Sequence, residues 1–190
     1  MSKTQSAMVQ LGTQAPAFEL ADVVSGRAVG RDDVAIDQKG LLVMFICVHC
    51  PYVQYVEAQL AQIGLDYEGK IGIAAISSND IEAYPQDGPE EMKAQAERLG
   101  FRFPYLFDET QEVARAYDAA CTPDFFLFDG EMNLVYRGQL DDSRPRRGEF
   151  GNDIPVTGKD LRTALDAVIA GKRPDTNQRN SIGCNIKWKE

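Results

Sequence analysis

Runs of apolar residues and helix-spaced apolar residues alternate along the first half of the chain. Residues 39–48 read KGLLVMFICV, a nearly unbroken apolar run rich in branched and aromatic side chains that ends just before Pro51. Residues 70–79 read KIGIAAISSN and repeat this pattern. Such runs predict strands that are buried on both faces. Between them, residues 52–66 carry apolar side chains at three- and four-residue steps, which predicts an amphipathic helix.

The second half of the chain continues the alternation and then changes it. Residues 88–100 predict a helix, with a proline in the first turn and a glycine at the end. A shorter helix is expected at 109–119. Residues 124–138 predict two strands joined by a short turn at Asp129, and so short a connection makes them antiparallel. A closing helix is expected at about 157–171.

This order of elements predicts the fold class. Alternating strands and helices, followed by a hairpin and a closing helix, favour a three-layer α/β fold with a mixed central sheet and helices on both faces. A length of 190 residues is enough for one core and short for two. We therefore expect residues 1–190 to form a single domain, with an N-terminal extension, a core at about 10–171 and a C-terminal tail at 172–190.

Charge and cysteine content narrow the possible partners. The formal net charge is −9, from 29 acidic against 20 basic side chains, and an acidic surface disfavours nucleic acid and anionic membranes. The sequence contains no apolar stretch long enough for a membrane span and no signal-peptide pattern. Four cysteines are too few for a disulfide scaffold. We expect a cytoplasmic protein, in which clustered cysteines are catalytic or bind metal.

Cys47 and Cys50 form a CxxC motif at the predicted junction of strand and helix. Free backbone N–H groups and the helix dipole at such a junction favour a thiolate. Three-residue spacing on a helical turn brings side chains to about 5–6 Å, close enough for a disulfide to form. His49 lies between them and, when protonated, lowers the pKa of a neighbouring thiol. The motif therefore predicts a redox-active dithiol.

Two other interpretations of the motif are weaker. Free cysteines are often buried apolar residues without chemistry, but a CxxC at this junction in an α/β chain is typical of redox sites. A zinc site would need three ligands on one turn, and the chain has one histidine. We therefore expect no metal and no cofactor. The ligands of the zinc alternative would be Cys47, His49 and Cys50, completed by Cys121 or Cys184.

With this pattern and the CxxC motif, the chain resembles the thioredoxin-like superfamily over about residues 10–170. It is most similar to the redoxin branch of alkyl hydroperoxide reductase/thiol-specific antioxidant-like proteins. The resemblance rests on LGTQAPAFELADVVSG near the amino end and on ACTPDFFLFDGEMNLVYRG in the second half. It implies a thioredoxin-like fold in which Pro123 is a cis-proline beside the dithiol and Thr122 pairs with the backbone of a bound partner chain. Cis peptide bonds are essentially confined to X-Pro, which agrees with this assignment.

The tail SIGCNIKWK and the pairing of HCPYV with CTPDF resemble an uncharacterised peroxiredoxin-like subgroup.

The chain departs from the peroxiredoxin pattern at the positions that activate peroxide. Peroxiredoxins carry a proline and a threonine before the peroxidatic cysteine and an arginine that polarises the peroxide. With Cys50 aligned to that cysteine, Val43 and Cys47 take the first two places and Pro123 takes that of the arginine. Peroxide cleavage needs such donors aimed at the developing charge. Four other arginines could supply one, although arginines near a loop are more often solvated: Arg137, Arg144, Arg146 and Arg147.

The chain also departs from the thioredoxin pattern. Ile46 replaces the tryptophan before the first cysteine, and Leu41 replaces the buried acid. His49 is similar to the histidine of strongly oxidising disulfide-forming members, where it stabilises a thiolate. A stabilised thiolate makes the disulfide a better oxidant. We therefore expect the dithiol/disulfide couple of Cys47 and Cys50 to have a more oxidising potential than that of thioredoxin.

Pro51 affects the roles of the two thiols. A residue before proline is disfavoured in helical geometry, so Cys50 is expected at the cap of the helix rather than inside it. Either sulfur could then attack. We expect Cys47 to be the attacker, because the first cysteine of a CxxC is normally the exposed one.

The remaining cysteines have two interpretations each. Cys121 lies near Pro123 and could approach the dithiol, but a small apolar filler is favoured. Cys184 could be an exposed additional resolving thiol, or the tail could dock with Ile186 and Trp188 buried.

The sequence thus predicts an enzyme, a thiol-disulfide oxidoreductase acting on protein or small-molecule thiols and disulfides. The first alternative is a peroxiredoxin-like thiol peroxidase with peroxides as substrates. The second is a non-enzymatic metal- or protein-binding module on the same fold.

Overall fold

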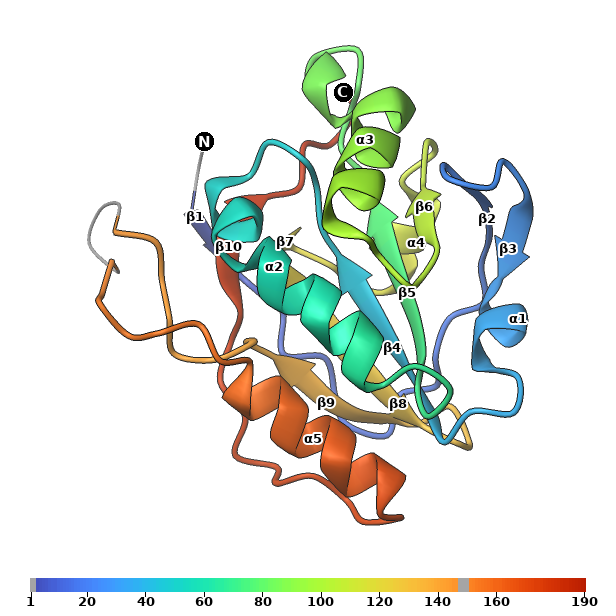
Figure 1. The fold of residues 1–190 in the computed structure, drawn as a ribbon, viewed down its shortest axis with the longest axis vertical. Helices are drawn as coiled ribbons and strands as arrows, with labels where there is room; N and C mark the ends of the chain where they lie inside the picture. The colour runs from blue at the N-terminus through green and yellow to red at the C-terminus, as the bar shows by residue number, and fades with distance from the viewer. Residues whose placement is uncertain (1–2, 147–150) are drawn as a thin grey trace.

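A seven-stranded sheet forms the centre of the computed structural model, which describes residues 3–146 and 151–190. Its strands are β2 (Glu19–Asp22), β3 (Ala28–Gly30), β4 (Gly40–Phe45), β5 (Gly72–Ser77), β6 (Tyr105–Phe107), β8 (Asp124–Asp129) and β9 (Leu134–Gly138). Their order across the sheet is β3-β2-β6-β5-β4-β8-β9 (Figure 1). Strands β4, β5 and β6 run parallel, and the other pairings are antiparallel. The predicted mixed sheet is therefore confirmed.

Helices cover both faces of this sheet. They are α1 (Arg31–Ala35), α2 (Pro51–Asp66), α3 (Pro89–Leu99), α4 (Glu112–Ala116), α5 (Lys159–Ile169) and the short 3₁₀ helix η1 (Pro85–Asp87). Side chains alternate along β4, so Leu42 and Met44 pack with α2, α3 and α5 on one face. Leu41, Val43 and Phe45 pack with α4 and the N-terminal segment on the other. This arrangement confirms the three-layer prediction.

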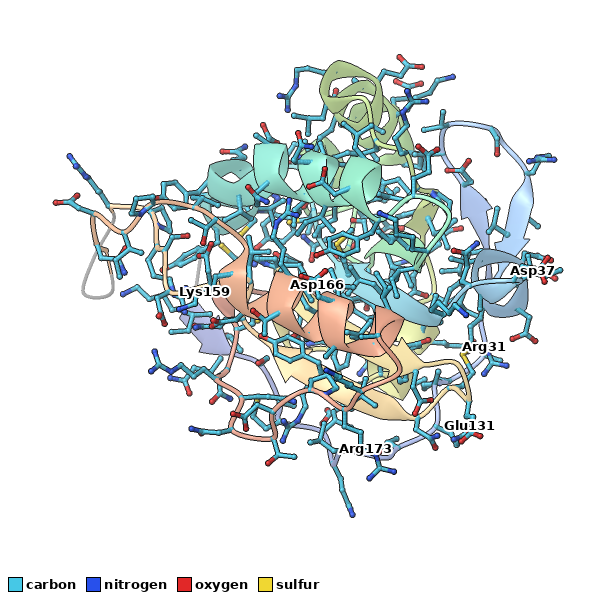
Figure 2. The ribbon with its side chains drawn as sticks, turned by 60° about the horizontal axis from the view of Figure 1, so that its bottom comes forward. Arg31, Asp37, Glu131, Lys159, Asp166 and Arg173 are labelled. Atoms are coloured by element: carbon cyan, nitrogen blue, oxygen red, sulfur yellow. The ribbon has the colours of Figure 1, made fainter. Side chains whose placement is uncertain are left out.

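Helices α2 and α5 lie on the same face of the sheet (Figure 1). The Tyr67 hydroxyl, at the end of α2, donates a 2.8 Å hydrogen bond to Asp166 of α5. An ion pair of 2.7 Å between Arg162 and Asp66 lies nearby. Figure 2 shows Lys159 at the amino end of α5 and Asp166 further along the same helix. These contacts fix the carboxyl end of α2, whose amino end carries the CxxC motif.

A second, three-stranded sheet joins the two ends of the described chain. Strand β10 (Ile182–Asn185) lies between β1 (Lys3–Gln5) and β7 (Cys121–Thr122), and both pairings are antiparallel. The expected C-terminal tail therefore contains a strand that is paired on both edges. Neither β1 nor β10 has a clear apolar alternation, so their pairing depends on contacts distant in sequence.

The predicted elements of the core appear within one to three residues of the expected ends. Helix α3 ends at Gly100, which adopts the left-handed conformation with φ of 66°. Apolar periodicity does not predict strand β6 or the β2–β3 hairpin, since strands of three or four residues are too short to show a period. Among the described residues, no helix combines the length and apolar character needed to span a membrane.

Gly72 tests whether the core and the tail unfold together. A Cβ at this position would lie 2.2 Å from the Val34 carbonyl oxygen in α1. We expect Gly72→Ala to lower the free energy of unfolding by about 3 kcal/mol. If residues 1–190 form one domain, far-UV circular dichroism and the fluorescence of Trp188, the chain's one tryptophan, should report the same urea midpoint and the same shift.

Gly130→Ala is the matched control, because the added carbon would meet the Lys39 carbonyl oxygen at an ordinary 3.5 Å. It should change the stability by less than about 0.5 kcal/mol. Two separate transitions, with only the circular dichroism transition shifted by Gly72→Ala, would show that the tail is an independent unit.

Candidate dithiol site

The CxxC motif lies between the end of β4 and the start of α2. Cys50 is the N-cap of α2, with extended backbone angles of φ −70° and ψ 120°, and Pro51 is the first helical residue. The Cys50 carbonyl accepts the first helical hydrogen bond, 2.9 Å from the Gln54 nitrogen. The expectation that Pro51 keeps Cys50 at the cap is confirmed.

The segment that precedes β8 lies against both sulfurs. The peptide bond between Thr122 and Pro123 is cis, as predicted. The Cys47 sulfur is 3.4 Å from the Thr122 hydroxyl, and the Cys50 sulfur is 3.2 Å from the Thr122 carbonyl oxygen. Thr122 and Pro123 therefore lie where the resemblance placed them, beside the dithiol.

The two thiols have opposite pKa shifts. Burial by itself raises the pKa of the Cys50 thiol, and the Thr122 carbonyl also favours its protonated form. Hydrogen bonds to its sulfur outweigh these effects and lower the pKa below the ordinary value. Their donors are Cys184, Cys47, Thr122 and the backbone N–H of Val53. The start of α2 favours the same charged form. Cys50 is therefore the sulfur that the site stabilises as a thiolate.

Cys47 is the protonated partner of this pair. Its hydrogen bond to Cys50 raises its pKa, and burial and the charge of Asp87 raise it further. The expectation that the first cysteine is exposed is wrong, because Cys47 is 1% exposed and Cys50 is 0% exposed. Exposure therefore gives no reason to choose Cys47 as the attacking sulfur.

Asp87, a residue that the sequence analysis missed, organises the loop between the two cysteines. Its carboxylate is fully buried and accepts hydrogen bonds from the backbone N–H groups of Val48 (2.9 Å) and His49 (3.0 Å). It also accepts one from the Asn79 side chain at 2.8 Å and pairs with the His49 ring. Asp87 precedes Gly-Pro, a sequence typical of an ordinary exposed turn, so only its partners reveal its role.

His49 is held between Asp87 and an aromatic ring. Its ring stacks on Tyr84 with centroids 5.6 Å apart and an interplanar angle of 7°. Because the Asp87 carboxylate contacts His49, a protonated ring would not be the uncompensated positive charge that the sequence suggested. The possible ligand atoms of Cys47, His49 and Asp87 lie within 4.8 Å of one another. This group differs from the zinc alternative considered from sequence, which had no Asp87.

Cys184 lies inside the site and is not exposed. It is 5% exposed, lies opposite Thr122 in the pairing of β10 with β7, and its thiol hydrogen-bonds Cys50. The tail docks through Ile186, which is buried, whereas Trp188 remains 37% exposed. The structure thus combines parts of both sequence interpretations, a docked tail and a thiol close to the dithiol.

Cys121 agrees better with the filler interpretation. It is fully buried, and its sulfur lies 3.7 Å from the Pro123 carbonyl oxygen. Burial raises the pKa of this thiol far above its ordinary value.

The pairing of β7 with β10 also affects the predicted role of Thr122, because a strand of the chain itself occupies one edge of β7. Pairing of Thr122 with a partner chain remains a prediction.

The arginines considered for peroxide activation have other partners. Arg137 donates to acceptors near both ends of the chain, and Arg144 donates to acceptors in its own loop. Arg146 pairs with a carboxylate of the same loop. Arg147 lies outside the described residues. The three described arginines therefore bind groups other than the two thiols of the dithiol.

Two solved structures are similar to this chain over nearly its whole length. An uncharacterized conserved protein from Geobacillus kaustophilus is 53% identical, with a TM-score of 0.93 over 100% of this chain and 97% of the other. A hypothetical protein from Sinorhizobium meliloti is 47% identical, with a TM-score of 0.91 over 98% of both chains. No curated protein matches the sequence.

More distant matches show the fold, and a family model shows the family. The thioredoxin domain of a thiol-disulfide oxidoreductase from Bacteroides vulgatus is 20% identical, with a TM-score of 0.54 over 68% of this chain and 88% of the other. This match confirms the thioredoxin-like fold. The model of the AhpC/TSA family matches residues 11–137, about two thirds of the chain. The chain therefore belongs to the AhpC/TSA family.

Proposed function

We propose that this protein is a thiol-disulfide oxidoreductase that exchanges disulfides through Cys47 and Cys50. One observation carries the proposal: two buried thiols with opposite pKa shifts meet at the start of α2, against Thr122 and cis-Pro123. Protein or small-molecule disulfides are the proposed substrates and the cytoplasm the proposed location. The exchange needs no cofactor.

Cys50 is the proposed nucleophile. Its thiolate attacks one sulfur of a substrate disulfide, forms a mixed disulfide, and expels the other substrate sulfur as a thiolate that takes up a proton. Cys47 then loses its proton and attacks the Cys50 sulfur, which releases the second substrate thiol and leaves a Cys47–Cys50 disulfide. His49 and Asp87 lie close to Cys47 and provide basic groups for this proton. An external dithiol reverses the sequence to reduce the protein.

A thiol peroxidase is the second candidate. Membership of the AhpC/TSA family and the stabilised thiolate of Cys50 favour it. In that reaction, the thiolate is oxidised to a sulfenic acid, which condenses with a neighbouring thiol and releases water. The contacts of Arg137, Arg144 and Arg146 argue against it, because they leave the developing oxygen charge without the usual donor.

Glutathione disulfide distinguishes the roles of the two cysteines. Cys50→Ser should slow the first step by about 100-fold or more, because it removes the stabilised thiolate. Cys47→Ser should retain that step, since the reactive sulfur remains. Intact-mass spectrometry measures the loss of reduced protein in each variant over time.

Cys121→Ser is the control for this experiment, because Cys121 is equally buried and its sulfur contacts the Pro123 carbonyl. It should react as the unsubstituted protein does. If Cys50→Ser reacts and Cys47→Ser does not, Cys47 is the attacking sulfur, as the exposure argument from sequence suggested.

Hydrogen peroxide tests the second candidate. We expect the reduced protein to consume peroxide no more than about tenfold faster than a simple thiolate at the same pH, because the side chains of Arg137, Arg144 and Arg146 are held by other partners. Stopped-flow measurement gives the rate. Much faster consumption would favour the peroxidase, and stoichiometric zinc in the same preparation would favour the metal-binding module.

Asp87→Asn tests the electrostatic part of the proposal. The pKa of Cys47 is raised by its hydrogen bond to Cys50, by burial and by the charge of Asp87. In a Cys50→Ser background the first cause is removed, so the effect of the carboxylate can be isolated. Removing its negative charge should then lower the pKa of Cys47, since the thiolate no longer faces a like charge. The pH dependence of iodoacetamide alkylation measures this pKa.

Asp108→Asn in the same background is the matched control. Asp108 is also fully buried, but it accepts its hydrogen bonds from Ser78 and the backbone N–H of Ala114. An equal shift in both variants would mean that Asp87 has no specific effect on Cys47.

A further inference from the structure

Strand β10 covers the dithiol and is held there by a close backbone contact. Cys184 pairs with Thr122, and Asn185 pairs with Cys121. A Cβ on Gly183 would lie 1.9 Å from the Thr122 carbonyl oxygen, so only glycine allows the two backbones to approach this closely. That same oxygen lies 3.2 Å from the Cys50 sulfur. Strand β10 is therefore held close to the sulfur of the proposed nucleophile.

Three thiols therefore meet at one point, with Cys50 in the middle. Cys47 reaches Cys50 from the loop after β4, and Cys184 reaches it from β10. All three side chains pack into the same buried cluster. Each outer thiol hydrogen-bonds the central sulfur, so each is placed to attack it after Cys50 has been oxidised.

We propose that Cys184 is a second resolving thiol, able to replace Cys47 and to form a Cys50–Cys184 disulfide. This inference rests on the proposed function, since it requires Cys50 to react first with a disulfide substrate. It assigns a catalytic role to the C-terminal strand, which lies outside the part of the chain that matches the family model.

The chemistry balances without any added component. Cys50 attacks the substrate disulfide and forms a mixed disulfide, and the first substrate sulfur leaves as a thiol. Cys184 then loses its proton and attacks the Cys50 sulfur, the bond to the substrate breaks, and the second substrate sulfur takes up a proton. One substrate disulfide is reduced to two thiols while Cys50 and Cys184 are oxidised to one disulfide. Attack by Cys47 on the Cys50 sulfur would convert this disulfide into Cys47–Cys50 and restore the Cys184 thiol.

Cys121 shows what a cysteine without this role looks like in the same region. It is as deeply buried as the other cysteines, yet its sulfur is directed to the Pro123 carbonyl oxygen at 3.7 Å. A cysteine that only fills space in the core could occupy such a position. The contact of Cys184 with the Cys50 sulfur is the additional feature, and it is the one that disulfide formation requires.

The test is to remove Cys47 and follow the adduct on Cys50. Cys47→Ser is treated with glutathione disulfide in the absence of oxygen, and intact masses and peptide maps are recorded over time. We expect a transient glutathione adduct on Cys50, followed by a Cys50–Cys184 disulfide and the release of a second glutathione. In Cys47→Ser/Cys184→Ser the adduct should persist about 100-fold longer, because the intramolecular thiol is absent.

Cys47→Ser/Cys121→Ser is the matched control and should resolve the adduct as fast as Cys47→Ser. Cys47→Ala repeats the experiment if serine at this buried position unfolds the protein. An adduct that persists equally with and without Cys184 overturns this inference and leaves the proposed function standing. Absence of any adduct in all these variants overturns the proposed role of Cys50 as the nucleophile, and this inference with it; absence of any reaction in the unsubstituted protein as well overturns the proposed function.

Discussion

Thr122 is the residue on which the site depends, because the two cysteines of the CxxC motif and Cys184 of β10 meet around it. Its hydroxyl faces Cys47, its carbonyl oxygen faces Cys50, and its backbone pairs with Cys184. The distances between the thiols are therefore set by one short segment and not by the CxxC spacing alone. A displacement of this segment would change the contacts of all three sulfurs together.

The chemical difference between the two CxxC thiols comes from their surroundings and not from their exposure. Donors to sulfur surround Cys50 at the start of α2, whereas the hydrogen bond to Cys50, burial and the negative charge of Asp87 all raise the pKa of Cys47. A buried carboxylate is costly unless its oxygens are satisfied, and two backbone N–H groups and the Asn79 side chain supply this. The same hydrogen bonds hold the loop that carries Val48 and His49, so the shape of the loop and its electrostatics have one origin.

Local patterns revealed much of the fold and the centre of the site. The run around β4 predicts a doubly buried strand, and Pro51 predicts the cap position of Cys50, because both depend on neighbours in sequence. Asp87 and β10 could not be predicted in this way. Nothing next to Asp87 indicates burial, and the place of β10 depends on Gly183 fitting against Thr122, a residue about 60 positions earlier. The burial of Cys47 escaped prediction for the same reason, since distant segments cover it.

The pairing of β10 with β7 also determines when the site is completed during synthesis. Of the described elements, β10 leaves the ribosome last, after the sheet and all the helices that surround the two CxxC thiols. Until then the edge of β7 and the sulfurs beneath it lack their cover. A nascent chain therefore carries the two CxxC thiols without the hydrogen bond from Cys184, and only the arrival of β10 completes the set of donors around the Cys50 sulfur.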